Sequence, residues 1–270
     1  MAKFSVFKDQ ESLFACPICQ APMHLDLSSL VCQNRHTFNI AKQGFVNFLR
    51  QTKGDKNYDM ASFEKRSQIL AAGYYDPILE VISEHLRDLP KHSHVLDVAC
   101  GEGYYTKDFN VEDKIGIDLS KEALKIASRN DKSTTYILKN IFDVPLKDHS
   151  LDLITTLFAP VSSEINRLLK DDGHFILVKP DYDHLYELKE AVYDNPYYNE
   201  LDDNHIEGLD LVNEYKIKQK AILNQDSINN LFKMTPYYHK TSRKDIEKLN
   251  NIETLTITFS FIIDLYKISK

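Results

Sequence analysis

Residues 95–106 read Val-Leu-Asp-Val-Ala-Cys-Gly-Glu-Gly-Tyr-Tyr-Thr and predict a buried strand that runs into a glycine turn. The apolar run at its start is short and continuous, which is consistent with a strand inside a parallel sheet. Gly101 and Gly103 let the backbone turn sharply and come close to a ligand. We expect a helix to open at Tyr104, so that its free amide groups and its dipole face that ligand.

The next apolar run ends at Asp118, roughly 20 residues after the turn. A carboxylate in this position can accept hydrogen bonds from both hydroxyls of a ribose, in dinucleotide sites and in S-adenosylmethionine sites alike. The third glycine of the dinucleotide fingerprint is missing, because Thr106 stands in its place. The pattern therefore predicts a nucleoside ligand without a pyrophosphate, S-adenosylmethionine. An ordinary strand-to-helix turn is the alternative.

A second motif lies near the start of the chain, where Cys16 and Cys19 form one pair and Cys32 and His36 form another after a gap of twelve residues. Three thiolates and one imidazole complete a tetrahedral zinc site, and each pair fits a tight turn. Alternating apolar residues at 23–27 suit a hairpin between the pairs. Because the protein fills all four positions, we expect one structural zinc that supplies much of the stability of this short module.

Composition sets limits on the class of protein. The chain has 270 residues, 43% of them hydrophobic, which suffices for one large domain and a small appendage. No stretch approaches the roughly 20 apolar residues that cross a bilayer, and the first residues form no apolar signal core, so we expect a cytoplasmic protein without a membrane partner. Clustered cysteines in such a protein favour a metal over disulfides. We interpret Cys100, far from the others, as a small side chain packed beneath the ligand without a redox role.

Charge is distributed unevenly along the chain. The first 70 residues carry nine Lys and Arg against six Asp and Glu, whereas the remaining 200 carry 24 against 34. The front is therefore the better candidate for contact with a polyanion, although a solvated surface explains the same bias. Arg50, Lys53 and Lys56 border or occupy a polar stretch at 51–57, an exposed loop that can serve a nucleic-acid strand or act as a plain linker. The apolar segment 41–50 is expected to pack the zinc module against another part of the protein.

The rest of the chain alternates apolar runs with amphipathic stretches, as in an open α/β sheet. We predict a class I S-adenosylmethionine-dependent methyltransferase fold, a Rossmann-like mixed sheet with a small N-terminal zinc-binding module. Three parts are expected: a zinc-binding module at 1–50, a linker with leading helices at 51–90, and a methyltransferase domain at 91–270. Further strands are expected at 136–140, 151–158, 173–179, 211–223 and 255–268, and helices at 62–72, 77–89, 121–128, 185–193, 228–234 and 244–249.

Ligands of open α/β sheets bind beyond the carboxyl ends of the strands, so residues placed there are candidate contacts. Asn140 can meet the adenine edge, and Phe158 can stack on a flat acceptor base beside a turn stiffened by Pro160. Tyr75, ahead of the first core strand, can lie over the cofactor, and His184 heads a helix at the same edge. Core packing is the alternative for Tyr75 and Phe158.

Taken together, these residues resemble the 23S ribosomal RNA guanine-N1 methyltransferases of the RlmA/RrmA family. The resemblance covers nearly the whole chain and rests on the order of its pieces, because many methyltransferases share the glycine turn alone. The pieces are the zinc quartet and residues 41–47, 72–75, 100–106, 158–160, 184–185 and 234–236.

The resemblance implies S-adenosylmethionine-dependent methylation of guanine N1 in a 23S rRNA hairpin, by a homodimer whose zinc module helps to grip the RNA. Members modify neighbouring guanines near the peptide exit tunnel, and the type found in Gram-positive bacteria is linked to macrolide resistance. Asn140 and residues 181–183 stand where we expect variable positions, so the role of Asn140 rests on its place in the strand. The implied cofactor contacts are Tyr75, Gly101, Glu102, Gly103, Tyr104, Tyr105, Thr106 and His184.

Methyl transfer from a sulfonium is an in-line displacement, so the protein must align the acceptor nitrogen with the methyl group. Guanine N1 carries a proton that has to leave, and Asp181, Asp183 and His184 stand at the right edge to take it, with no choice among them. One alternative is a methyltransferase acting on another RNA or on a small molecule, and the zinc module argues against the small molecule. Another is a non-catalytic zinc-containing RNA-binding adaptor, and the intact Asp118 and glycine turn argue against that.

Overall fold

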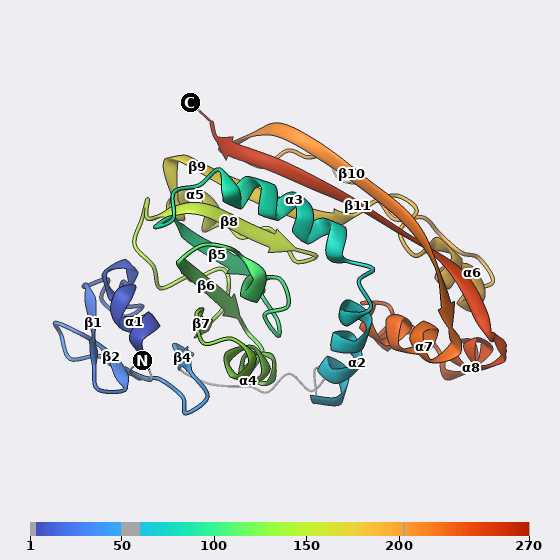
Figure 1. Cartoon of the computed structure of the whole chain (residues 1–270), viewed down its shortest axis with the longest axis horizontal. Helices are drawn as coiled ribbons and strands as arrows, with labels where there is room; N and C mark the ends of the chain where they lie inside the picture. Colours follow the sequence, from blue (N-terminus) through green and yellow to red (C-terminus); the bar gives the residue numbers. More distant parts are fainter. Residues whose placement is uncertain (1–3, 50–59, 202, 270) are drawn as a thin grey trace.

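The computed structural model describes residues 4–49, 60–201 and 203–269, and the backbone alone at 60–62 and 64. The loop expected at 51–57, with Lys53 and Lys56, lies outside the described residues, as does the neighbouring Arg50. The described part begins within the N-terminal module and ends just after a long strand near the C-terminus (Figure 1).

Among the described residues, eight strands form one sheet in the order β10-β11-β9-β8-β5-β6-β7-β4 (Figure 1). Strands β9 to β4 in that order run parallel, whereas β11 is antiparallel to both of its neighbours. The order reverses between β5 and β8, which places a ligand beyond the carboxyl ends of those strands. The strands are β4 (Phe45–Asn47), β5 (His94–Val98), β6 (Asp113–Asp118), β7 (Thr135–Leu138), β8 (Leu151–Leu157), β9 (Leu169–Pro180), β10 (Leu209–Asn224) and β11 (Thr254–Ile268).

The helices follow the amphipathic stretches of the sequence. In α3, Ile78, Ile82 and Leu86 recur every four residues and form one buried face. Helices α2, α3, α6 and α7 share a core cluster on one face of the sheet. The helices are α1 (Ser5–Asp9), α2 (Met60–Ala71), α3 (Asp76–Arg87), α4 (Lys121–Asn130), α5 (Ile165–Leu168), α6 (Tyr186–Val192), α7 (Gln225–Met234) and α8 (Arg243–Glu247), with short 3-10 turns at Glu11–Leu13, Thr106–Asp108, Tyr238–Lys240 and Lys248–Asn251.

The N-terminal module folds around a small antiparallel sheet of β1 (Met23–Asp26), β2 (Ser29–Cys32) and β3 (Thr37–Asn39). This confirms the predicted hairpin between the two ligand pairs. No helix of the described residues is long and apolar enough to cross a membrane.

This module is also part of the main sheet. Strand β4 pairs in parallel with β7 and forms the last strand at that edge. Phe14 and Phe48 join Leu96 and Ile115 in the core cluster on the second face of the sheet. The amide of Ala15 also donates to the Pro145 carbonyl at 3.1 Å. For the described residues 41–49, the expectation that segment 41–50 packs the module against another part of the protein is thus confirmed, and the partner is the sheet itself.

The predicted strands and helices beyond the glycine turn are confirmed, with ends that shift by a few residues; β9 begins at Leu169 rather than at 173. The helix expected from Tyr104 is wrong, because residues 101–105 form turns and Thr106–Asp108 a single 3-10 turn. The connection from the end of β5 back to the start of β6 must cover the length of β5, five residues or about 16 Å. An α-helix needs about eleven residues to span that distance. Only nine residues, 104–112, are present before β6.

One buried acid in β5 makes stability depend on pH. Burial raises the pKa of Asp97 from 3.8 to about 6, against the hydrogen bonds that Thr106 and Thr155 donate to its carboxylate. The folded state therefore binds a proton more tightly than the unfolded state, and stability falls as the pH rises from about 4 through 6. We expect Asp97→Asn to raise the free energy of unfolding at pH 7.5 by about 3 kcal/mol, as measured by urea denaturation.

The gain should disappear at pH 4, where the wild-type carboxyl is itself protonated. Asp171→Asn is the matched control, since that side chain is fully exposed and its replacement should leave stability unchanged at both pH values. A less stable Asp97→Asn protein at pH 7.5 would contradict this prediction.

Candidate active site and metal centre

The glycine turn lies directly after β5 and departs from ordinary backbone geometry. Ala99, Gly101 and Gly103 have positive φ angles of 58°, 57° and 74°. A Cβ atom on Gly103 would lie 2.5 Å from the hydroxyl of Tyr136, so only glycine fits there. Strained backbone of this kind is typical of functional sites, because the surrounding structure must hold it in place.

Asp118 ends β6 and is bonded to this turn. Its Oδ2 accepts a hydrogen bond from the amide of Gly101 at 2.8 Å, and its Oδ1 accepts one from the amide of Ser120 at 2.6 Å. Burial raises the pKa of Asp118, although these two amides act in the opposite direction. The structure thus joins the turn and the acidic residue that the sequence singled out.

Arg66 and Glu102 complete the charged part of this site, and sequence reasoning missed Arg66. The guanidinium comes from α2 and lies 3.5 Å from Glu102, measured from Nε to Oε1. Burial lowers the pKa of Arg66, but Glu102 and Asp118 outweigh that effect and raise it. Glu102 is only 7% exposed, and its carboxylate oxygens have no hydrogen-bond partner among the described residues. A buried carboxylate of this kind is a signal of a ligand site.

The other predicted turn residues place their side chains in the protein. The hydroxyl of Tyr104 donates to the Leu70 carbonyl at 2.8 Å and lies 2.6 Å from Asp76. Tyr105 is buried in the core cluster beneath α3, and Thr106 donates to Asp97. Any ligand contact from these three positions therefore comes from the backbone.

Exposed apolar side chains follow three of the parallel strands, beyond their carboxyl ends. Leu119 follows β6, Phe142 follows β7 and Phe158 follows β8, and all three are exposed. Phe158 has a φ of 57°, which is a strained value for a bulky residue, and its amide donates to Val178 at 2.9 Å. Pro160, two residues on, is exposed. Flat apolar surface at a polar ligand edge suits the two faces of a purine.

Tyr75 and His184 belong to an aromatic cluster with Phe158. The ring centroid of Tyr75 lies 6.0 Å from that of Phe158 and 6.3 Å from that of His184. The rings of Phe158 and His184 are inclined by only 20°, with centroids 6.4 Å apart. The structure therefore brings together three of the predicted side chains, all from different segments of the chain.

The environment of His184 sets its protonation state. Burial lowers the pKa of His184 to about 3, so the ring is neutral at physiological pH. Its Nδ1 accepts a hydrogen bond from the Ser260 amide at 3.2 Å, which leaves the proton on Nε2. His184 can therefore donate a hydrogen bond to a ligand, and it is a poor base.

The two predicted acids beside His184 differ in their partners. Asp183 forms an ion pair with Lys218 at 2.5 Å, and that pair helps to lower the pKa of Asp183 against the opposing effect of burial. Asp181 accepts hydrogen bonds from the Ser260 hydroxyl at 3.0 Å and from the Tyr182 amide at 2.7 Å. Both hold the turn after β9 in place.

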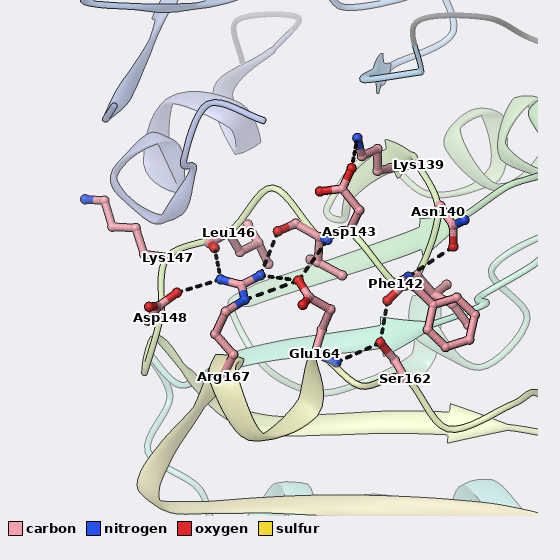
Figure 2. A network of polar contacts seen from close by, with 12 residues as sticks. Lys139, Asn140, Phe142, Asp143, Leu146, Lys147, Asp148, Ser162, Glu164 and Arg167 are labelled. Atoms are coloured by element: carbon pink, nitrogen blue, oxygen red, sulfur yellow. Dashed lines mark hydrogen bonds and ion pairs between the residues drawn. The ribbon is translucent and has the colours of Figure 1, made fainter. Parts of the chain in front are cut away.

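Asn140 lies in a loop after β7 whose contacts Figure 2 shows. The side chain of Asn140 is exposed, and its Oδ1 accepts a hydrogen bond from the Phe142 amide at 3.0 Å. Arg167 holds the same loop through the carbonyls of Leu146 and Val144. A cleft of about 610 Å³ lies between parts of this loop and the zinc module, with Ala15, Gln20, Phe142, Asp143, Val144, Lys147, Asp148, Glu164 and Arg167 as its lining.

The metal centre is formed as predicted by Cys16, Cys19, Cys32 and His36, whose ligand atoms all lie within 4.8 Å of one another. The Cys19 and Cys32 sulfurs are 3.7 Å apart, and Nδ1 of His36 lies 3.4 Å from the Cys32 sulfur. A tetrahedron with Zn–S bonds of about 2.3 Å has sulfur–sulfur edges of about 3.8 Å. The Ala21 amide lowers the pKa of Cys19 to about 6, which favours the thiolate that zinc needs. The four residues therefore fit one structural zinc ion.

Comparison with known proteins agrees with both halves of this site. A model of a methyltransferase domain matches residues 89–240, and a model of the N-terminal zinc ribbon of RlmA matches residues 14–55. YxjB of Bacillus subtilis, assigned as a 23S rRNA (guanine-N(1)-)-methyltransferase, is 32% identical over 268 residues, 92% of this chain and 94% of that protein. The 23S rRNA (guanine(748)-N(1))-methyltransferase of Streptomyces fradiae is 32% identical over 66% of each chain. A solved methyltransferase of Thiobacillus denitrificans with bound S-adenosyl-L-homocysteine has a TM-score of 0.41 at 16% identity, over 71% of this chain and 90% of its own.

Proposed function

Because this chain belongs to the family of the 23S rRNA (guanine-N1-)-methyltransferases, we propose that it methylates N1 of a guanine in a hairpin of 23S rRNA, with S-adenosylmethionine as the donor. The observation that carries the proposal is the bond between Asp118 and the Gly101 amide, in one chain with the Cys3His cluster. The hydrogen bond joins the two parts of a nucleoside site. The Cys3His cluster belongs to the zinc ribbon of a family whose named members act on RNA.

The test is mass spectrometry of 23S rRNA from cells that lack the gene. A methylguanine present in the parent strain should be missing, and the purified protein with S-adenosylmethionine should restore it. An unchanged rRNA would show that the substrate is another molecule.

S-adenosylmethionine supplies a methyl group on a positively charged sulfur, which a nucleophile displaces in line. The protein's part is to hold both reactants. We assign the ribose hydroxyls to Asp118, the adenine to Leu119 and Asn140, and the methionine part to the backbone of residues 101–106. The position of Leu119 directly after Asp118 supports its place against the ring.

Arg66 and Glu102 are assigned to the charged end of the donor, the carboxylate to the guanidinium and the ammonium to the carboxylate. Arg66→Ala should weaken S-adenosylmethionine binding by about 10- to 100-fold, because a charge-assisted hydrogen bond contributes roughly 1.5–3 kcal/mol. Titration calorimetry measures this. Lys65→Ala, which removes the same charge from the neighbouring position of α2, is the control and should bind normally. Equal affinities for the two variants would rule out this role of Arg66.

The acceptor guanine is assigned to the surface beside Phe158 and Pro160. Tyr75 and His184 pack near Phe158. The Nε2–H group of His184 is available to donate a hydrogen bond to S-adenosylmethionine or to the guanine. Because the ring is neutral, its role should not change between pH 6 and 8. Of the three acids and bases considered for the N1 proton, His184 is the least suited.

The zinc module is assigned to the RNA. Its residues Ala15 and Gln20 line the cleft described above together with residues of the loop that follows β7. The homodimer, the cytoplasmic location and the link to macrolide resistance stay predictions. Sedimentation of the purified protein, fractionation of cells and macrolide sensitivity of a deletion strain test them in turn.

A further inference from the structure

Three tyrosines form a continuous stack at the end of β9. The ring of Tyr198 lies 4.3 Å from that of Tyr182 at an angle of 9°, and 4.0 Å from that of Tyr186 at 10°. Tyr182 is 52% exposed and Tyr198 is 42% exposed. Large aromatic rings are ordinarily buried, so a stack held parallel in water needs an explanation.

The stack is built on a rigid support. Asn199 donates hydrogen bonds from its side chain to the carbonyls of Asp181 at 2.8 Å and His184 at 3.2 Å, and so fastens its own loop to the turn after β9. Lys189, which is buried, donates to Asn199 at 2.7 Å and lies 4.3 Å from the ring centre of Tyr197. Because this network orders both strands of the loop, the tyrosine rings are preorganised for a partner.

The place of the stack links it to the candidate active site. Tyr182 follows Pro180 by two residues and precedes His184 by two, and His184 packs near Phe158. The exposed ring of Tyr182 thus stands on the same short turn as a residue of the site, at the carboxyl end of β9. A nucleic acid that places one base at the site would therefore bring the adjacent nucleotides close to this turn.

A row of lysines lies beside the stack. Lys216, Lys218 and Lys220 alternate along β10 on one face, and each is more than half exposed. Lys218 stands opposite Ser260 in β11 and pairs with Asp183, and Lys220 lies 3.9 Å from Glu187. Two of the carboxylates near the tyrosines, those of Asp183 and Glu187, are thus paired with lysines of the same chain. A flat aromatic surface next to a basic row is the arrangement that single-stranded nucleic acids use.

We propose that this tyrosine stack binds an unpaired base of the RNA substrate, which adds to the column on the free face of Tyr182. The inference rests on the proposed function, since it assumes an RNA substrate, and it names a contact outside the cofactor site. The base serves to hold the strand that flanks the target guanine. Stacking does not read sequence, so this surface should add affinity without choosing the modified base.

The experiment measures filter binding of the full-length protein to unmethylated 23S rRNA from the deletion strain. Tyr182→Leu removes the ring and keeps an apolar side chain, and we expect it to raise the Kd about tenfold. Tyr182→Phe keeps the ring and should bind within twofold of the wild type. Calorimetric binding of S-adenosylmethionine should be the same for all three proteins, and the salt dependence of RNA binding should keep its slope, because no phosphate contact is lost.

Ultraviolet cross-linking of the same rRNA, followed by mass spectrometry, should find a nucleotide on the peptide that contains Tyr182. If Tyr182→Leu binds the rRNA with the same affinity as the wild type, and the wild-type protein binds and methylates the rRNA, this inference alone would be overturned. A wild-type protein that neither binds nor methylates the rRNA would overturn the proposed function as well. A changed sedimentation coefficient of Tyr182→Leu with unchanged RNA affinity would show that the stack joins two copies of the chain, and would also overturn it.

Discussion

Replacement of Asp118 by alanine is expected to weaken S-adenosylmethionine binding by about 100-fold or more and to abolish methylation at ordinary donor concentrations. The carboxylate is assigned two ribose hydroxyls, and each charge-assisted hydrogen bond is worth roughly 1.5–3 kcal/mol. The variant also removes the acceptor for the Gly101 amide, so the turn loses a bond that holds its shape. Titration calorimetry with the purified protein gives the affinity directly.

Asp118→Asn separates the two effects, since the amide oxygen can still accept from Gly101 but carries no charge. Its affinity should lie between those of the wild type and Asp118→Ala. Asp113→Ala is the matched control, because Asp113 begins the same strand at the opposite edge of the sheet. An Asp118→Ala protein that binds the donor like Asp113→Ala would remove the nucleoside site from this turn.

Removal of the metal should be the most damaging change to stability. Cys32→Ala takes away a ligand that lies 3.7 Å from the Cys19 sulfur and 3.4 Å from His36. We expect the zinc content to fall from one ion per chain to near zero, with a loss of several kcal/mol of folding free energy, because metal binding in so small a module is coupled to its folding. Elemental analysis and thermal unfolding measure the two quantities.

The loss should reach beyond the module, because Phe14 and Phe48 pack on the main sheet. Cys100→Ala provides the control: this cysteine is buried beside Gly116, outside the metal cluster, and its replacement should leave the zinc content unchanged. One bound zinc per chain in Cys32→Ala would mean that another residue completes the site.

Local pattern accounts for most of the sheet and for the metal site. The strand before Gly101, the turn and Asp118 each depend on residues that are adjacent or nearly so, and a continuous apolar run marks a buried parallel strand in any context. The zinc ligands are similar, because tetrahedral coordination restricts the spacing of Cys16, Cys19, Cys32 and His36. These features were predicted correctly for a physical reason.

Contacts between distant segments were not predictable in the same way. Strand β4 has three residues, too few to show a period, and its partner β7 lies about 90 residues away. Arg66 looks like any basic residue of a helix until the fold sets it against Glu102. The α-helix expected from Tyr104 is absent for a different reason. The connection to β6 is too short for an α-helix, whatever the helix propensity of its residues.

Strand β4 makes the metal-bearing segment part of the methyltransferase sheet. Because β4 pairs with β7, and because Phe14 packs on the second face of the sheet, the metal-bearing segment forms part of the core of the methyltransferase domain. A truncated chain that began at β5 would expose the unpaired edge of β7 and an apolar face of the sheet. Both features promote aggregation. The metal-bearing segment therefore contributes to the stability of the methyltransferase sheet as well as to its own fold.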